Sequence, residues 1–273
     1  MNPVLRNLLS VARRFKLAAT LNILGLSVAF AAFMIIMIQL DYDYGFDKFH
    51  KGYDKIFRVE FSNKTTTQAV ISRPLAEQFF ESSPHIVAGA ISNPWGWEVS
   101  FYVENNGERN FFKEKGIGVS PEFTDVFTFD FVEGEKDALK SPGKMLIPLS
   151  LSRKLFGKES AIDKQLFTGS EKSPVVGAVY RDFPANSVVN NYLYYAIPAE
   201  ENKQNKGNWN YHVYIRVNQA SNAKLLFDNF KRNFDVKLAF GDNFNWDESG
   251  SGIRLTALPD IHFVTDVQYD QRV

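Results

Sequence analysis

The feature that most constrains this chain is an apolar run over residues 17–40, which contains no charged side chain. As a helix, a run of about 24 residues would measure roughly 36 Å, whereas the hydrocarbon core of a bilayer is roughly 30 Å thick. The run is therefore long enough to cross a membrane with some tilt. We expect residues 17–40 to form one transmembrane helix that precedes an ordinary water-soluble sequence.

Three other interpretations of the apolar run fit less well. Ala29-Phe30-Ala31 matches a signal-peptidase pattern, but cleavage there would leave a new apolar N-terminus. Arg13-Arg14 suggests a twin-arginine signal, although the surrounding residues match that motif poorly. A buried core helix would rarely remain uncharged over such a length. An uncleaved membrane span explains the run best.

Charged residues on either side give the span a direction. The basic residues that precede it are Arg6, Arg13, Arg14 and Lys16, and no acidic residue accompanies them. Basic flanks favour the cytoplasmic side of a membrane. We therefore expect a cytoplasmic N-terminus and an extracytoplasmic chain from residue 41 onward. Residues 1–16 are amphipathic, so they either lie in the cytoplasmic membrane interface or extend the same helix.

Residues 41–54 are expected to connect the span to the outer domain. The connector opens with a predicted collar at the membrane surface, formed by Asp41, Tyr42, Asp43 and Tyr44. The acidic spacing through Asp47 superficially resembles a calcium-binding loop. However, aromatic residues alternate with the acids, and tyrosine favours the membrane interface. We therefore prefer the collar to a calcium site.

Composition excludes several functions. Lys+Arg and Asp+Glu both number 31, so the chain lacks the basic excess of a nucleic-acid-binding protein. The absence of cysteine excludes disulfides, thiol nucleophiles and cysteine-ligated metals. Aromatic residues make up 15% of the sequence, which indicates a packed core and not a disordered chain.

The sequence after the connector contains a strand–helix–strand pattern twice. In the first copy, alternation predicts a half-buried strand at 55–61, and a helix and a second strand follow at 71–80 and 86–91. In the second copy, the strand, helix and strand fall at 211–217, 223–234 and 253–258, and Ser221 or Asn222 is expected to cap the helix. Two such units predict an α+β, ferredoxin-like split βαβ lobe built from residues 55–105 and 207–265.

Residues 106–206 are expected to form an inserted β-rich lobe. Two strands at 98–103 and 109–113 flank Asn105-Asn106-Gly107, which is a strong hairpin signal. Further strands are predicted at 145–147, 175–181 and 192–197, and short helices at 121–126 and 150–156. Polar, glycine-containing loops are expected at 133–143, 200–207 and 241–252.

No catalytic motif or metal motif stands out. The four histidines have no helical pairing, and HExxH, GxSxG and phosphate-binding loops are absent from the sequence. Acidic residues are plentiful, but nothing in the sequence selects a catalytic pair. Trp95 and Trp97 could form a ligand-stacking platform, although a structural turn with core tryptophans is the preferred interpretation. We expect no enzyme activity, no metal site and no cofactor in this chain.

Several segments, taken together, resemble the start of MacB/FtsX-type ABC transporter permeases, in a form similar to Bacteroidetes-like members. The resemblance begins with NILGLS at 22–27, YGFDKFH at 44–50 and DKIFRV at 54–59. It continues in the same order through RPLA at 73–76, VSPEFTDVF at 119–127, LSRKLFG at 151–157, VGAVYRDFP at 176–184 and LPDIHF at 258–263. The individual segments are weak signals, but their conserved order covers nearly the whole chain.

The resemblance implies a two-lobed periplasmic core domain in the bacterial inner membrane. It also implies a homodimer or paired permease, a separate subunit that binds ATP, and a periplasmic protein or substrate as a further partner. Such permeases carry at least three more spans after this domain, and residues 266–273 fall where the next span should begin. We therefore interpret the sequence as the N-terminal part of a permease.

The leading hypothesis is a module that couples cytoplasmic ATP hydrolysis to periplasmic movement or to export of a substrate. The alternative is a single-span periplasmic sensor or protein-binding assembly module. A membrane-anchored hydrolase is a third class, and it would require ionisable side chains that converge in a deep pocket.

Overall fold

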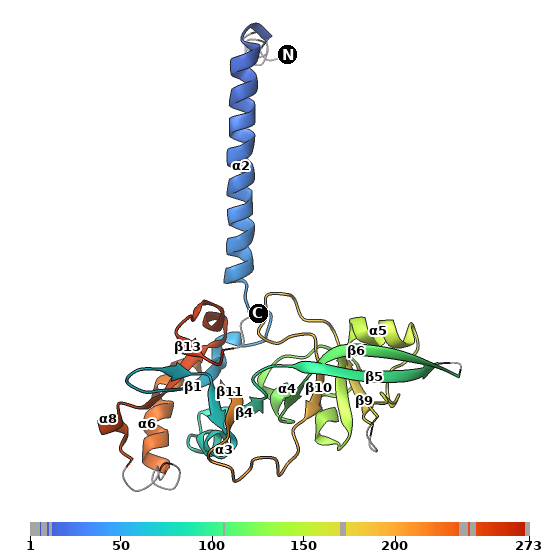
Figure 1. The fold of residues 1–273 in the computed structure, drawn as a ribbon. Helices are drawn as coiled ribbons and strands as arrows, with labels where there is room; N and C mark the ends of the chain where they lie inside the picture. Colours follow the sequence, from blue (N-terminus) through green and yellow to red (C-terminus); the bar gives the residue numbers. More distant parts are fainter. Residues whose placement is uncertain are drawn as a thin grey trace. The chain divides into compact units, whose positions relative to one another are not determined.

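The computed structural model describes residues 13–105, 107–169, 173–234 and 244–270, together with Arg6, Ser10 and Phe240. The chain separates into an anchor unit, Met1–Phe46, and an outer unit, Asp47–Val273. Figure 1 shows the single long helix of the anchor unit and the strands of the outer unit. The two units are described in turn.

The anchor unit contains helix α2, Lys16–Tyr44, which has 29 residues and therefore a length of about 44 Å. None of its residues is buried, and apolar side chains face outward on all sides. A helix that is apolar on all sides and has no buried residue fits a membrane span better than the core helix of a soluble fold. In the described chain, α2 is the one helix with the length and composition of a membrane span. It continues through Tyr44, four residues beyond the predicted end at residue 40.

The outer unit contains the predicted split βαβ lobe. The first copy consists of β1 (Ile56–Ser62), α3 (Arg73–Glu81) and β4 (Ile86–Ser92). The second copy consists of β11 (Trp209–Val217), α6 (Ala223–Asn233) and β12 (Gly252–Ala257). The strands lie in the order β12-β1-β11-β4, and all neighbours are antiparallel. This is the strand order of a ferredoxin-like sheet. Central register pairs are Val59↔Val213 and Val59↔Leu255.

Helices α3 and α6 cover one face of this sheet. The rings of Phe79 and Phe230 meet at 5.2 Å between centroids, and Leu75 and Leu226 are buried beside them. Pro74 lies in the first turn of α3, as expected, but the helix begins at Arg73 because residues 70–72 form β3 (Val70–Ser72). Asn222 precedes α6 without a capping side-chain bond, so the predicted cap is wrong.

The insert forms a second group of strands on the same hydrogen-bonded sheet. It contains β5 (Trp97–Asn105), β6 (Glu108–Val119), β7 (Phe131–Gly134), β8 (Lys144–Pro148), β9 (Val175–Tyr180) and β10 (Leu193–Ala196), in the order β5-β6-β10-β8-β9-β7. Helices α4 (Phe123–Val126) and α5 (Leu149–Phe156) lie between strands in the sequence. Figure 1 shows the long β5–β6 hairpin at one end of this group.

Short elements complete the unit: η1 (Tyr53–Lys55), β2 (Thr67–Gln68), η2 (Lys136–Lys140), η3 (Ala220–Asn222), α8 (Trp246–Ser249), η4 (Leu258–Phe263) and β13 (Val267–Gln268). The loop predictions at 133–143 and 241–252 are therefore wrong in part, because β7, η2 and α8 occupy some of that sequence. Leu139 and Trp246 are buried there and fix these elements against the core. The β5–β6 hairpin also places 97–105 with the insert, across the boundary expected at residue 105.

One hydrophobic cluster joins the two groups of strands. Ile56, Ala90 and Tyr214 come from the split βαβ lobe, whereas Phe127 and Tyr194 come from the insert. β4 pairs with β6 at Ser92↔Val119, and Asn93 and Ser120 donate further backbone bonds at this junction. The two lobes therefore share a sheet and a core.

Candidate functional site

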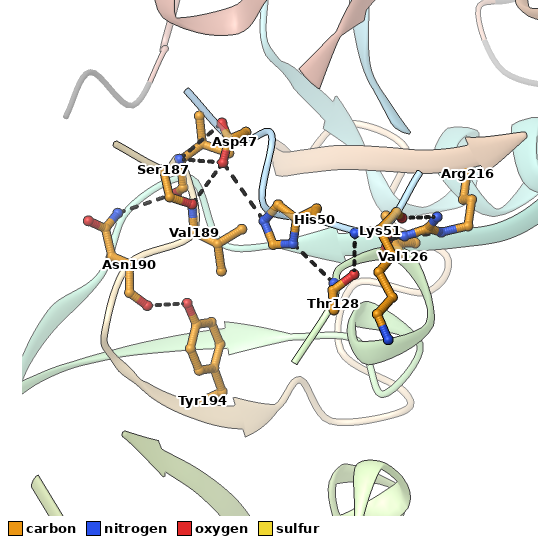
Figure 2. A network of polar contacts seen from close by, with 11 residues as sticks. Asp47, His50, Lys51, Val126, Thr128, Ser187, Val189, Asn190, Tyr194 and Arg216 are labelled. Atoms are coloured by element: carbon orange, nitrogen blue, oxygen red, sulfur yellow. Dashed lines mark hydrogen bonds and ion pairs between the residues drawn. The ribbon is translucent and has the colours of Figure 1, made fainter. Parts of the chain in front are cut away.

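A buried polar network begins at the first residue of the outer unit, three residues after α2 ends at Tyr44 (Figure 2). Asp47 is fully buried and adopts a left-handed backbone conformation with φ 57°, which aspartate tolerates better than most residues. Its N–H donates to the Asn186 carbonyl at 2.9 Å. Its carboxylate accepts from the Ser187 hydroxyl at 2.7 Å and from the Val188 N–H at 3.1 Å. This one residue therefore binds the 186–188 turn of the insert through both backbone and side chain.

Burial changes the protonation of Asp47. Removal of the carboxylate from water raises its pKa to about 7, although the bonds from Ser187 and Val188 lower it. A carboxyl group with such a pKa is partly protonated near neutral pH. Asp47 can therefore change its charge without leaving the core.

His50 lies one turn further along, and 1% of its surface is exposed. The Thr128 N–H donates to His50 Nδ1 at 3.1 Å, so the neutral ring carries its proton on Nε2. That atom is 3.8 Å from Asp47 Oδ1, which is longer than a hydrogen bond. Burial, with the nearby positive charge of Arg216, lowers the His50 pKa to about 3. The Asp47–His50 contact is therefore not an ion pair at neutral pH.

Backbone bonds continue the network into both lobes. The Lys51 N–H donates to Thr128 Oγ1 at 2.9 Å, and Arg216 Nη1 donates to the Lys51 carbonyl at 2.8 Å. Arg216 lies on β11 and also donates to the Val126 carbonyl at 3.0 Å. Gly52 follows with φ 64°, and an added Cβ there would lie 3.1 Å from Arg216 Nη1. Residues 47–52 are thus fixed to the insert and to the central sheet together.

A second charged cluster holds the last described residues. Arg58 and Glu60 on β1 are buried, and Arg58 Nε donates to Glu60 Oε1 at 2.8 Å. Arg58 also pairs with Asp270, and Arg254 bridges Glu60 at 2.6 Å to Asp266 at 2.9 Å. His212 Nε2 donates to the Tyr269 carbonyl at 2.8 Å; burial lowers the His212 pKa to about 4. The last described residues are therefore anchored to strands β1 and β11, and β11 also holds Lys51 through Arg216.

The predicted membrane-flanking residues lie elsewhere. Arg6, Arg13, Arg14 and Lys16 are exposed, and Lys16 is the first residue of α2. The collar residues, Asp41, Tyr42, Asp43 and Tyr44, form the last turn of α2, where Gln39 Nε2 donates to Asp43 Oδ1 at 2.9 Å. Their contact with a membrane stays a prediction. Asp41 and Asp43 are helical whereas Asp47 is bonded to the insert, so these acids do not form a calcium loop.

The sequence analysis identified neither the buried polar network at 47–52 nor the charged cluster around Arg58 as a site. The one available signal for the polar network was the motif at 44–50, which contains Asp47 and His50. The expectation for the tryptophans is wrong, because Trp95 and Trp97 are 52% and 47% exposed. Among the described residues, no group of three or more histidine, aspartate or glutamate side chains is placed to hold a metal ion.

The fold and the apolar helix together define a membrane-anchored protein with an α+β outer domain. The profile of the family described as MacB-like periplasmic core domain matches residues 19–247. The chain belongs to this family. The family is a component of ABC transporter permeases and not an enzyme class, and it implies membrane association and an ATP-binding partner.

One solved structure shows the same fold, and two further structures align less closely. A domain of a putative permease protein from Porphyromonas gingivalis aligns with TM-score 0.58 and 22% identity, covering 75% of this chain and 90% of that chain. The periplasmic region of MacB from Actinobacillus actinomycetemcomitans aligns with TM-score 0.49 and 14% identity, over 77% and 90% of the chains. The extracellular domain of the noncanonic ABC-type transporter YknZ from Gram-positive bacteria aligns with TM-score 0.45 and 16% identity, covering 74% of this chain and 99% of that chain. Comparison with curated proteins gives no match.

Proposed function

We propose that this chain is the N-terminal part of an ABC permease whose outer unit converts motion of the membrane span into motion outside the membrane. The N-terminus is cytoplasmic, ATP is bound by a separate subunit, and two permease copies act together. The movement either drives a periplasmic partner or exports a substrate. In this proposal the domain performs no chemistry of its own.

The observation that carries this proposal is the anchoring of residues 47–51. Asp47 follows the last residue of α2 by only three positions, and its carboxylate is held by the insert. Lys51 is held by Arg216 of the central strand β11. A displacement of the chain at residue 47 would therefore act on both lobes, which share one core.

The experiment uses the absence of cysteine from this chain, and cysteines in the rest of the permease or in the ATP-binding subunit are replaced beforehand. Spin labels are placed at Met37→Cys on α2 and at Lys224→Cys on α6, in the permease reconstituted in vesicles with its ATP-binding subunit. We expect trapping of the ATP-bound state to shift the distance distribution between the labels. Asp47→Ala should weaken or broaden this shift, because Ser187 and Val188 lose their acceptor.

The matched control is Asp163→Ala. Asp163 also has a positive φ, 59°, but its side chain is 70% exposed and pairs with Lys144 at the surface. This control should keep the wild-type shift, and near-UV circular dichroism should show that both variants are folded. A wild-type distance that does not respond to ATP would contradict the proposed coupling.

The exposed tryptophans favour a second candidate function, in which the domain recruits an extracytoplasmic protein. Trp95 and Trp97 flank Gly96, and Trp97 packs against Tyr195 at 5.7 Å between ring centroids. Aromatic side chains with this exposure often form the centre of protein interfaces. The vesicle experiment separates the two functions, since a sensor or assembly module would not respond to ATP.

A further inference from the structure

A second feature of the outer unit lies directly beside residues 47–51: a cavity of about 530 Å³. Its lining includes Phe49, Lys51, Phe129, Asp130, Arg181 and Phe183. The segment at 49–51 and the segment at 181–183, which follows β9, thus line the same pocket. All of these residues belong to the outer unit.

The floor of the pocket is aromatic and well packed. The Phe183 ring lies 5.0 Å from Phe129 in an edge-to-face arrangement and 5.7 Å from Phe49. Phe183 is buried, whereas Phe49 remains 38% exposed and also packs on His50 at 4.0 Å. The faces of such rings attract cations and apolar groups alike.

The rim of the pocket carries both signs of charge. Arg181 Nε donates to Asp130 Oδ2 at 2.7 Å, and both side chains are more than half exposed. Among the described residues, no carboxylate lies within ion-pair distance of the Lys51 ammonium. Lys51 is itself exposed, while its backbone is fixed by Thr128 and Arg216. A second carboxylate of the lining, Asp182, accepts from the Ser150 N–H at 2.9 Å. The rim therefore offers cationic donors for a phosphate and, at Asp130, a carboxylate for an ammonium group.

Chain length limits how far this pocket can lie from the membrane. Lys51 follows Tyr44, the last residue of α2, by seven positions, and such a segment reaches at most about 25 Å when fully extended. The headgroup layer adds roughly 5–8 Å to each side of the hydrocarbon core. The chain therefore keeps Lys51 within about 25 Å of the end of the membrane span, so that a lipid headgroup from the same membrane is a candidate occupant of the pocket.

We propose that this pocket binds the headgroup of a zwitterionic aminophospholipid from the membrane that holds the chain. Lys51 and the free N–H groups of Arg181 bind the phosphate, and Asp130 with the aromatic floor binds the primary ammonium. An anionic lipid carries an uncharged or negative group where the aminophospholipid carries its ammonium, and that group would lie against Asp130. The charge pattern therefore favours the aminophospholipid. The inference goes beyond the proposed coupling function and does not require ATP.

The test uses the full chain in nanodiscs that contain a phosphatidylethanolamine analogue with a photoreactive headgroup. After illumination, adducts are mapped by peptide mass spectrometry. We expect adducts in the peptides that contain Phe49–Lys51 and Arg181–Phe183, and competition by unlabelled phosphatidylethanolamine but not by phosphatidylglycerol. Lys51→Gln should reduce these adducts about tenfold, as loss of one charge-assisted contact implies.

Lys48→Gln is the matched control, because Lys48 is an exposed lysine three positions earlier that does not line the pocket. It should leave the labelling unchanged. Asp130→Asn should weaken the preference for the ethanolamine lipid over phosphatidylglycerol. Both lysine variants retain the backbone bonds at 47–51, so near-UV circular dichroism should match the wild type.

Three results would overturn the proposal: equal competition by phosphatidylglycerol, equal loss of adducts in both lysine variants, or adducts outside the pocket. Cross-linking of the pocket peptides to a second protein chain in place of lipid would assign the cavity to a protein partner instead. A negative result would leave the coupling proposal intact, because the spin-label experiment reads ATP-driven movement and does not depend on a bound lipid.

Discussion

At the scale of single residues, Asp47 and His50 have pKa values that burial shifts in opposite directions. The Asp47 pKa rises from 3.8 to about 7, so the folded state binds this proton more tightly than the unfolded state. Its contribution to stability is complete below pH 3.8 and is lost as pH rises to about 7. The His50 pKa falls from 6.5 to about 3, so its contribution is complete above pH 6.5 and is lost as pH falls to about 3.

These two effects should cancel between about pH 4 and 6.5, and a single substitution should reveal them. In Asp47→Asn, the titration of Asp47 is removed while that of His50 remains. Relative to wild type, the free energy of unfolding of the variant should rise by about 1.4 kcal/mol per pH unit between about pH 4 and 7. Denaturant unfolding at several pH values measures this difference. The exposed Asp163→Asn is the control, and parallel curves for Asp47→Asn and wild type would contradict the pKa assignments.

At the scale of elements, β1 shows what the sequence pattern could and could not reveal. The alternation at 55–61 predicts the strand correctly, because apolar Phe57, Val59 and Phe61 face the helices. It also predicts a solvated second face, and this is wrong, since Arg58 and Glu60 are buried there. Their partners Arg254 and Asp270 lie about 200 residues later in the chain. No local pattern can predict a pair that only the tertiary fold brings together.

This buried cluster should hold β13 in place, because β13 has only two residues paired to β2. Arg58→Ala would leave Glu60 and Asp270 without their buried partner, which typically costs about 3–5 kcal/mol. We expect lower stability and faster amide hydrogen exchange at residues 267–270. Arg254→Ala is the control: its side chain is 33% exposed, and the loss should be about 1 kcal/mol. Unchanged exchange at 267–270 in Arg58→Ala would show that other contacts anchor this segment.

At the scale of the whole molecule, local sequence signals predict the two lobes but do not predict the junction between them. Amphipathic periodicity and turn residues predict the helices and most strands, because those signals are read within one element. The junction depends on single contacts between distant elements, such as Ser92↔Val119 and the packing of Phe127 on Tyr214 at 5.0 Å. The anchoring of Asp47 by Ser187 depends in the same way on a loop 140 positions away. Resemblance to a family implies that two lobes exist, but not which residues make them one unit.

If the shared core makes the lobes one cooperative unit, a cavity at the junction should destabilise both equally. Phe127 is 1% exposed and contacts the rings of His50, Phe123 and Tyr214, so Phe127→Ala should cost about 3–5 kcal/mol. Hydrogen exchange by mass spectrometry should accelerate by the same factor in β8 of the insert and in β11 of the split βαβ lobe. Phe111→Ala is the control, since Phe111 is 76% exposed on the hairpin, and its effect should stay within about 0.5 kcal/mol. Acceleration confined to β8 would mean that the lobes unfold separately, and a domain of that kind could not transmit a displacement at residue 47 to both lobes as one body.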